Sequence, residues 1–201
     1  MNDTKSILLV GVGGQGTILA SKILSEGLAR KGFDIKMSEI HGMSQRGGSV
    51  STHVRYGSKV ASPIVSEGEA DVLVAFEKSE AVRWLNYLKK GGWLVVNNYE
   101  IKSLPVLTGL AEYPDGVVEQ LGKSVDNIKV FNATQIACEL GNERAQNIVL
   151  LGALIKALGI ALNGLIHFLC LNAIECRDVT IQQYLLIADL QYAGLDGIDG
   201  V

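Results

Sequence analysis

A short polar segment near residue 45 gathers the side chains best suited to chemistry. Residues 39–50 read EIHGMSQRGGSV, so a carboxylate, an imidazole and a guanidinium stand close together between two apolar runs. Arg46 follows the expected end of a strand, where open α/β sheets form their ligand crevice. An arginine there can bind a carboxylate or phosphate through two parallel hydrogen bonds. Alternatively, Arg46 pairs with a surface acid and the glycines only permit a bend.

The neighbours of Arg46 are further candidates for a site. His41 is a second candidate catalytic residue, although a lone histidine more often has a structural hydrogen bond, and His53 has the same two interpretations. Neither histidine has neighbours at metal-ligand spacing, so no metal site is expected. The candidates for a loop that contacts a partner or substrate are Gly42, Met43, Ser44, Gln45, Gly47 and Gly48.

A glycine-rich turn at residues 11–16 is a second candidate site. The sequence GVGGQG follows an apolar run and precedes helical spacing, so its backbone N–H groups could hold a phosphate. Glu39 lies 23 residues beyond Gly16, near the spacing of the acid that binds a ribose hydroxyl. Three interpretations stay open: NAD or FAD binding, binding of another phosphate or cofactor group, and a structural or interface turn. The candidate residues are Gly11, Gly13, Gly14, Gln15 and Gly16.

Glu77 ends the run ADVLVAFE, which is continuously apolar after its aspartate. Such a run is typical of a central parallel strand that is covered on both faces. The Glu77 carboxylate either faces the same crevice as Arg46 or caps the helix that follows.

The order of the expected elements predicts a three-layer αβα domain with a mostly parallel sheet and an antiparallel hairpin excursion. The first strand, the helix over 17–31 and a second parallel strand near residue 40 form a Rossmann-like βαβ unit. Residues 49–56 alternate, which predicts a strand with one solvated face, and residues 59–65 are expected to pair back antiparallel. Further strands are expected at 70–77, 91–98 and 128–133, with helices at 79–88 and from residue 134 onward.

Length and composition favour one domain over residues 1–201, with a helical tail over 159–201. The chain has 201 residues, of which 48% are hydrophobic and 19% are charged, so it can bury a large core and still have apolar surface for a partner. The net charge of −3, without a lysine or arginine cluster, argues against nucleic-acid binding.

The sequence also argues against a membrane protein and an exported one. Residues 148–171 are apolar enough to span a bilayer, but Lys156, Asn163 and His167 interrupt them, which favours two buried helices. The N-terminal apolar run leads directly into the glycine turn and has no cleavage-site pattern. We expect a cytoplasmic protein in which the three cysteines are reduced.

Four segments resemble the gamma-type domain of the 2-oxoacid:ferredoxin oxidoreductase family, and within it the small subunits of the indolepyruvate type. HGMSQRGG is far more specific than a glycine turn, and the resemblance extends from about residue 5 to residue 158. After that point, NGLIHFLCL replaces the polar linker that is usual in the family. The segments are VGVGGQGTILASKIL, HGMSQRGGSVSTHVRYG, ASPIV and ADVLVAFEKSEAVRW.

The resemblance implies an enzyme subunit that is inactive alone. Enzymes of this family decarboxylate a 2-oxoacid on thiamine diphosphate, pass electrons through iron–sulfur clusters to ferredoxin and use CoA to release an acyl-CoA. This chain has three cysteines and no Cys-x-x-Cys pair, so it cannot supply the four thiolates of a cluster. It also lacks the Gly-Asp-Gly element that precedes Asn-Asn in thiamine diphosphate sites. We therefore expect both cofactors in a larger partner subunit, and residues 39–50 to complete a site or interface on it.

The alternative function is a free-standing NAD(P)- or FAD-binding protein that uses the glycine turn and Glu39. For the enzyme subunit, indolepyruvate or another arylpyruvate is the favoured 2-oxoacid. A homodimer of the isolated chain is compatible with either function.

Overall fold

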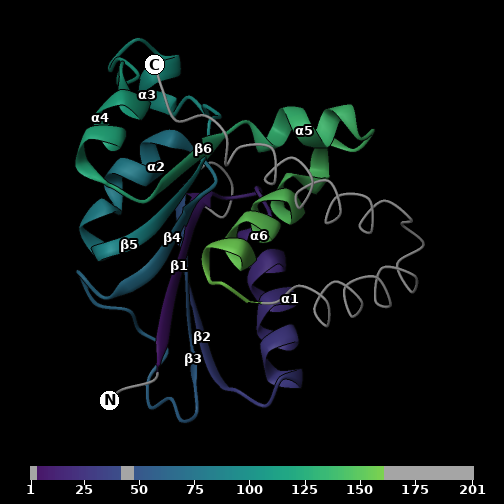
Figure 1. Cartoon of the computed structure of the whole chain (residues 1–201). Helices are drawn as coiled ribbons and strands as arrows, with labels where there is room; N and C mark the ends of the chain where they lie inside the picture. Colours follow the sequence, from purple (N-terminus) through teal and green to yellow (C-terminus); the bar gives the residue numbers. More distant parts are fainter. Residues whose placement is uncertain (1–3, 42–47, 161–201) are drawn as a thin grey trace.

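The computed structural model describes residues 4–41 and 48–160 and forms, within them, a six-stranded sheet between two layers of helices (Figure 1). Across the sheet the strand order is β2-β3-β1-β4-β5-β6. The strands are β1 (Lys5–Val12), β2 (Asp34–His41), β3 (Ser49–Gly57), β4 (Ala70–Ala75), β5 (Leu88–Asn97) and β6 (Ile128–Phe131).

Helices cover both faces of this sheet, as the sequence predicts. Helices α1 and α6 pack on one face, and α2 and α4 pack on the other (Figure 1). The central strands β1 and β4 are buried on both faces, because their alternate side chains enter two separate hydrophobic clusters. The helices are α1 (Thr17–Arg30), α2 (Lys78–Arg83), α3 (Leu104–Leu107), α4 (Val117–Ser124), α5 (Ala133–Glu139) and α6 (Gln146–Ala157), with 3-10 turns η1 (Leu85–Tyr87) and η2 (Glu143–Ala145).

The sheet is mostly parallel, but the place of the antiparallel strand differs from the prediction. Strands β1, β4, β5 and β6 are parallel neighbours, whereas β3 lies antiparallel between β1 and β2. The first two strands therefore run in the same direction without pairing. The antiparallel hairpin is β2–β3, and the polar segment after His41 forms its connection.

The prediction that residues 59–65 form a strand is wrong. These residues cross the face of β3 instead, where Val65 N donates to His53 Nδ1 at 3.1 Å and the Arg55 guanidinium donates to Ile64 O at 3.1 Å. The prediction of a solvated face on β3 is wrong for the same reason. Ser51 and His53 are 1% and 2% exposed, since this crossing segment and the rings of Trp84 and Tyr87 lie against that face.

Several element boundaries also differ from those expected. The helix expected at 79–88 ends at Arg83, η1 follows, and β5 begins at Leu88 rather than near residue 91. Trp84 and Trp93 are half-buried at the margins of the two hydrophobic clusters. The helical tail expected over 159–201 lies outside the described residues from 161 onward. Among the helices that the structure does describe, none has the length and apolar character of a membrane span.

We predict that the free energy of unfolding falls as the pH drops from about 7 to about 5, and that His53→Asn weakens this dependence. Burial lowers the pKa of the His53 imidazole below its ordinary value of 6.5, so the unfolded chain binds this proton more readily than the folded chain. The contribution of neutral His53 is complete above about pH 6.5 and is lost as the pH falls toward its folded pKa, by at most about 1.4 kcal/mol per pH unit. Urea unfolding at several pH values measures the effect.

Asparagine suits this test because its side-chain oxygen can still accept the hydrogen bond from Val65 N. The matched control is His41→Asn, since His41 is exposed on β2. We expect this control to keep the pH dependence of the unchanged chain. The same dependence in His53→Asn would contradict the assignment to His53.

Candidate functional site

Two predicted motifs meet at the carboxyl ends of the parallel strands. Because β3 runs antiparallel to β1, its first residues lie beside the last residues of β1, and Ser49 is paired with Val12. Immediately beyond this pair, Gly13 N donates to Gly48 O at 2.9 Å. The glycine turn and the end of the polar segment are thus joined where open α/β sheets bind their ligands.

The glycine turn is closed by the side chain of Gln15, which is 6% exposed. Its Oε1 accepts from Val12 N at 2.8 Å, and its Nε2 donates to Phe76 O at 2.8 Å, so it links β1 to the residue after β4. Gly11 permits this arrangement because a Cβ there would lie 2.9 Å from both Gln15 Oε1 and Phe76 Cβ. The contacts of Gln15 therefore explain why residue 11 is a glycine.

A separate structural reason explains why residue 16 is a glycine. Its φ of 83° is left-handed, and a Cβ there would lie 2.7 Å from Nδ2 of Asn147 on α6. Asn147 is 4% exposed, so its side chain has little room to withdraw. Gly14 also has a positive φ but faces open space. The turn is thus a packed junction between β1, α1 and α6, and Gly13 and Gly14 form its more open part.

The structure does not bring Glu39 to the glycine turn. Glu39 is exposed on the edge strand β2 and is paired with Thr52 of β3, which in turn is paired with Leu9 of β1. Two strand spacings, about 10 Å, therefore separate Glu39 from the first strand. In dinucleotide sites the corresponding acid lies on the strand next to the first. His41 is exposed at the end of the same edge strand.

Glu77 occupies the second of its two predicted places, the N-cap of α2. It is 0% exposed, and its Oε2 accepts from Ser79 N at 2.8 Å and Glu80 N at 3.1 Å. Its Oε1 accepts from the Tyr113 hydroxyl and from Ile101 N, so the cap also holds the segment after β5. Burial and the Glu77 carboxylate raise the pKa of the Tyr113 phenol well above its usual value. Both oxygens are thus used within the fold.

A second buried carboxylate, Glu80, went unnoticed in the sequence. Glu80 is 3% exposed and accepts from Ser49 Oγ and, at 3.3 Å, from Trp84 Nε1. Arg83 Nε pairs with its other oxygen at 3.1 Å. The first residue of β3 is therefore fixed to α2. In the sequence, Glu80 stands three residues after the helix cap. A glutamate at that position usually lies in solvent, so its burial was not predicted.

Asn97, at the end of β5, was also missed as a site residue. Its Nδ2 donates to Phe76 O at 3.2 Å, the carbonyl that Gln15 also binds, and its Oδ1 accepts from Ala133 N at 2.8 Å. Thr134 and Gln146 extend this network to α6. An asparagine that ends an apolar strand was a usable signal, because a buried amide requires partners.

The remaining predicted residues lie outside the described part of the chain. His41 and Gly48 mark the two ends of this stretch, and both belong to the β2–β3 hairpin or its connection. The structure therefore places the Gly48 flank beside the carboxyl end of β1 and the His41 flank at the carboxyl end of the edge strand β2. The residues outside it are Gly42, Met43, Ser44, Gln45, Arg46 and Gly47.

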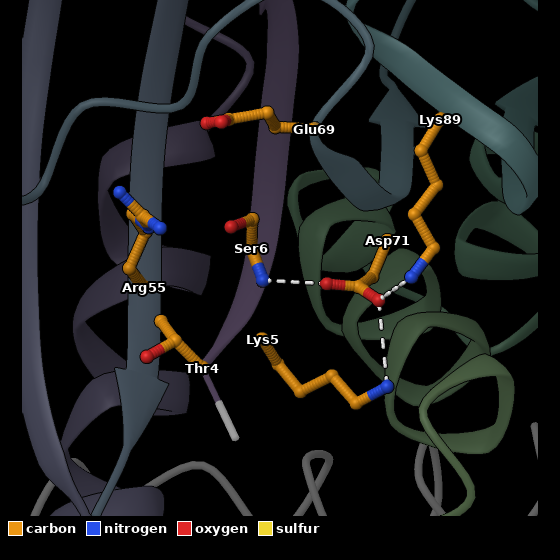
Figure 2. A pocket seen from close by; sticks show the side chains of 7 residues that line it. All are labelled: Thr4, Lys5, Ser6, Arg55, Glu69, Asp71 and Lys89. Carbon is orange, nitrogen blue, oxygen red and sulfur yellow. Dashed lines mark hydrogen bonds and ion pairs between the residues drawn. The ribbon is translucent and has the colours of Figure 1, made fainter. Parts of the chain in front are cut away.

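A polar hollow of about 310 Å³ lies at the opposite end of the sheet (Figure 2). Asp71 points into it and accepts from Ser6 N at 2.9 Å, from Lys5 and from Lys89. Burial opposes ionisation of Asp71, but these hydrogen bonds outweigh it and hold the pKa of the carboxyl below its ordinary value. The cluster ties β1, β4 and β5 together, away from the carboxyl ends of the parallel strands. The lining residues are Thr4, Lys5, Ser6, Arg55, Glu69, Asp71 and Lys89.

Comparison with protein families identifies the chain's class. Residues 6–170 match the family model described as pyruvate ferredoxin/flavodoxin oxidoreductase. The chain belongs to this family.

Small subunits of heteromeric family members are similar to the chain over most of their length. Indolepyruvate oxidoreductase subunit IorB of Thermococcus kodakarensis is 41% identical over 163 residues, which cover 79% of this chain and 80% of that subunit. The pyruvate/ketoisovalerate oxidoreductases common subunit gamma of Thermococcus litoralis is 30% identical, with 75% and 76% covered. This chain is therefore a small subunit of a 2-oxoacid oxidoreductase, and the alternative of a free-standing dinucleotide-binding protein is not supported.

Solved structures share the fold. The gamma subunit of keto/oxoacid ferredoxin oxidoreductase from Geobacter sulfurreducens has a TM-score of 0.66 and 22% identity, with 92% of this chain and 95% of that one covered. The 2-oxoglutarate:ferredoxin oxidoreductase of Magnetococcus marinus has a TM-score of 0.68 and 21% identity over all of this chain, but only 32% of the longer one. The αβα fold thus occurs both as a separate subunit and within a longer polypeptide.

We predict that Gly16→Ala lowers the free energy of unfolding by about 1–3 kcal/mol. The new Cβ would sit in a left-handed backbone conformation and would clash with Asn147. The matched control is Gly122→Ala within α4, where nothing lies within 4 Å of the new Cβ and no positive φ occurs. That control should match or exceed the unchanged chain in stability. Denaturant unfolding compares the two, and equal stabilities would refute the packed-junction interpretation.

Proposed function

We propose that the chain is the small subunit of an oxidoreductase that oxidatively decarboxylates indolepyruvate or a related arylpyruvate to an acyl-CoA. The observation that carries this proposal is the 41% identity to subunit IorB over four fifths of both chains. The larger partner subunit holds thiamine diphosphate and the iron–sulfur clusters, CoA is the co-substrate and ferredoxin accepts the electrons. The Magnetococcus neighbour, which contains coenzyme A and succinyl-CoA, supports CoA as the co-substrate.

The described residues of this chain do not fit a thiamine diphosphate site. Asn97, the first asparagine of VVNN, uses both atoms of its amide within the fold. Asn98 is exposed, and its backbone N–H bonds to Phe131 O. In the part of the chain that the structure describes, no three His, Cys, Asp or Glu side chains gather as metal ligands. These observations support the assignment of both cofactors to the partner.

The site on this subunit is the polar connection of the β2–β3 hairpin together with the glycine turn. Arg46 binds an anionic group of a substrate or co-substrate, with His41 and the residues between them as the contact with the partner. A connection of this length exceeds the 2–5 residues of ordinary hairpin loops, which is typical of a functional loop. The complex operates in the cytoplasm.

We predict that Arg46→Ala lowers kcat/KM of the assembled complex at least about tenfold, or roughly 1.4 kcal/mol, because an anionic group loses its positioning partner. Steady-state assays with several 2-oxoacids and with CoA measure the effect. Arg30→Ala is the matched control, because Arg30 is an exposed arginine at the end of α1 that is far from the glycine turn. Unchanged kinetics of a fully assembled Arg46→Ala complex would mean that this subunit only supports assembly.

We also predict that the chain alone is colourless, binds no thiamine diphosphate and decarboxylates no 2-oxoacid. Its three cysteines cannot hold an iron–sulfur cluster. Co-expression with a cysteine-rich, thiamine-dependent partner should give a brown complex that reduces a viologen dye with an arylpyruvate and CoA. Dye reduction by the chain alone, or iron that co-purifies with it, would move the cofactors onto this subunit.

A further inference from the structure

A row of polar side chains crosses the sheet at the amino ends of the parallel strands. Arg55 of β3 is paired with Ser6 of β1, and the backbone N–H of Ser6 donates to Asp71, which lies beside it on β4. Asp71 in turn binds Lys89 of β5. All four residues line the hollow of about 310 Å³. Figure 2 shows Arg55 on one side of Ser6 and Asp71 with its lysines on the other.

The lysine end of this row has an excess of positive charge. Lys5 and Lys89 both donate to the same oxygen of Asp71, Oδ1, while Oδ2 accepts from the Ser6 backbone at 2.9 Å. An ammonium group has three donors, so neither lysine is saturated by this one bond. Two cations thus share one carboxylate, and an added negative charge beside them would reduce their mutual repulsion.

The charge of Arg55, at the other end of the row, is not balanced by an acid. Its guanidinium donates to Ile64 O, a neutral carbonyl, at 3.1 Å. Among the described residues it has no carboxylate partner, and its buried Nε has no acceptor. Glu69, the second acid of the lining, is exposed and accepts from Ser66 N at 3.2 Å instead. A guanidinium is well suited to bind a planar or tetrahedral oxyanion.

Ser6 presents a hydroxyl between these two centres of positive charge. Ser6 is 3% exposed, and its hydroxyl has no hydrogen-bond partner in the part of the chain that the structure describes. Figure 2 shows the hydroxyl turned toward Arg55. Buried hydroxyl groups in proteins generally have a partner. Three cationic and two acidic side chains line the hollow, so the lining has a net charge of about +1 at neutral pH.

We propose that this hollow binds one small oxyanion, a phosphate or a carboxylate group. The Ser6 hydroxyl and the Arg55 guanidinium donate to it, and Lys5 and Lys89 supply attractive charge. The hollow lies at the opposite end of the sheet from the glycine turn, so it is separate from the site of the proposed function. This inference therefore goes beyond that function and does not depend on it.

Calorimetric titration of the full chain in chloride buffer, at constant ionic strength, tests the proposal. Inorganic phosphate is the probe in one arm and acetate in the other, and saturable binding of one ion per chain is expected in at least one arm. Arg55→Gln should weaken this binding at least about tenfold and Ser6→Ala at least about threefold. The matched control is Lys36→Gln, because Lys36 is exposed, is paired with Arg55 from β2 and does not line the hollow. The control should stay within about twofold.

Asp71→Asn should change the affinity in the opposite direction. The variant removes a negative charge from the hollow and releases two ammonium groups, so the ion that binds should bind at least about threefold more tightly. The asparagine oxygen can still accept from the Ser6 backbone. A purely structural role of this cluster would not produce tighter binding.

The outcomes decide the proposal whether or not every variant folds. Ser6→Ala removes a hydroxyl that has no partner among the described residues, so its Tm in chloride buffer should fall by no more than about 2–4 °C. If Arg55→Gln does not fold, the comparison of Ser6→Ala with Lys36→Gln decides. No saturable binding in either arm, an affinity unchanged by Ser6→Ala, or weaker binding to Asp71→Asn would each overturn the proposal and leave the proposed function untouched.

Discussion

The insertion of β3 between β1 and β2 is the constraint on which the rest of the structure depends. Every residue of β1 from Lys5 to Val12 has a partner on β3, and β2 pairs along the other edge of the same strand. This insertion displaces β2 to the edge of the sheet, carrying Glu39 away from the glycine turn. It also reverses the chain so that the hairpin connection returns to the carboxyl ends of the parallel strands. The two ends of the β2–β3 connection therefore lie at the end of the sheet where parallel strands alone would have only βα turns.

Hydrogen bonds from one short segment organise this end of the sheet. Three groups in the segment after β4 accept these hydrogen bonds. The Phe76 carbonyl binds the glycine turn, the Glu77 carboxylate binds the segment after β5, and the Glu80 carboxylate binds the start of β3. Each is buried, so an unpaired group would cost about 1–3 kcal/mol. The described parts of the segments that carry the family resemblance are therefore in mutual contact, which gives their co-occurrence in the sequence a physical reason.

The sequence predicted best those features that depend on local spacing. The buried strands β1 and β4, the helix α1 and the two possible places of Glu77 followed from apolar runs and cap chemistry. The predictions were wrong where polar residues are buried. The alternation of Ser51, His53 and Arg55 indicates which side chains share a face, but a covering segment from elsewhere in the chain leaves no local pattern. Strand order could not be predicted for the same reason, because a βαβ pattern fixes the relative direction of its two strands but not which strands are neighbours in the sheet.

The antiparallel half of the sheet has a consequence for how the chain forms during synthesis. Strands β1, β2 and β3 with helix α1 are all contained in the first 57 residues, so they leave the ribosome before β4. The β2–β3 hairpin closes a short connection, whereas the pairing of β3 with β1 and the parallel crossovers close longer ones at a higher entropic cost. The nascent chain can therefore assemble an N-terminal hairpin against β1 first. Strands β4, β5 and β6 then join one at a time, in the order of their emergence and along one growing edge.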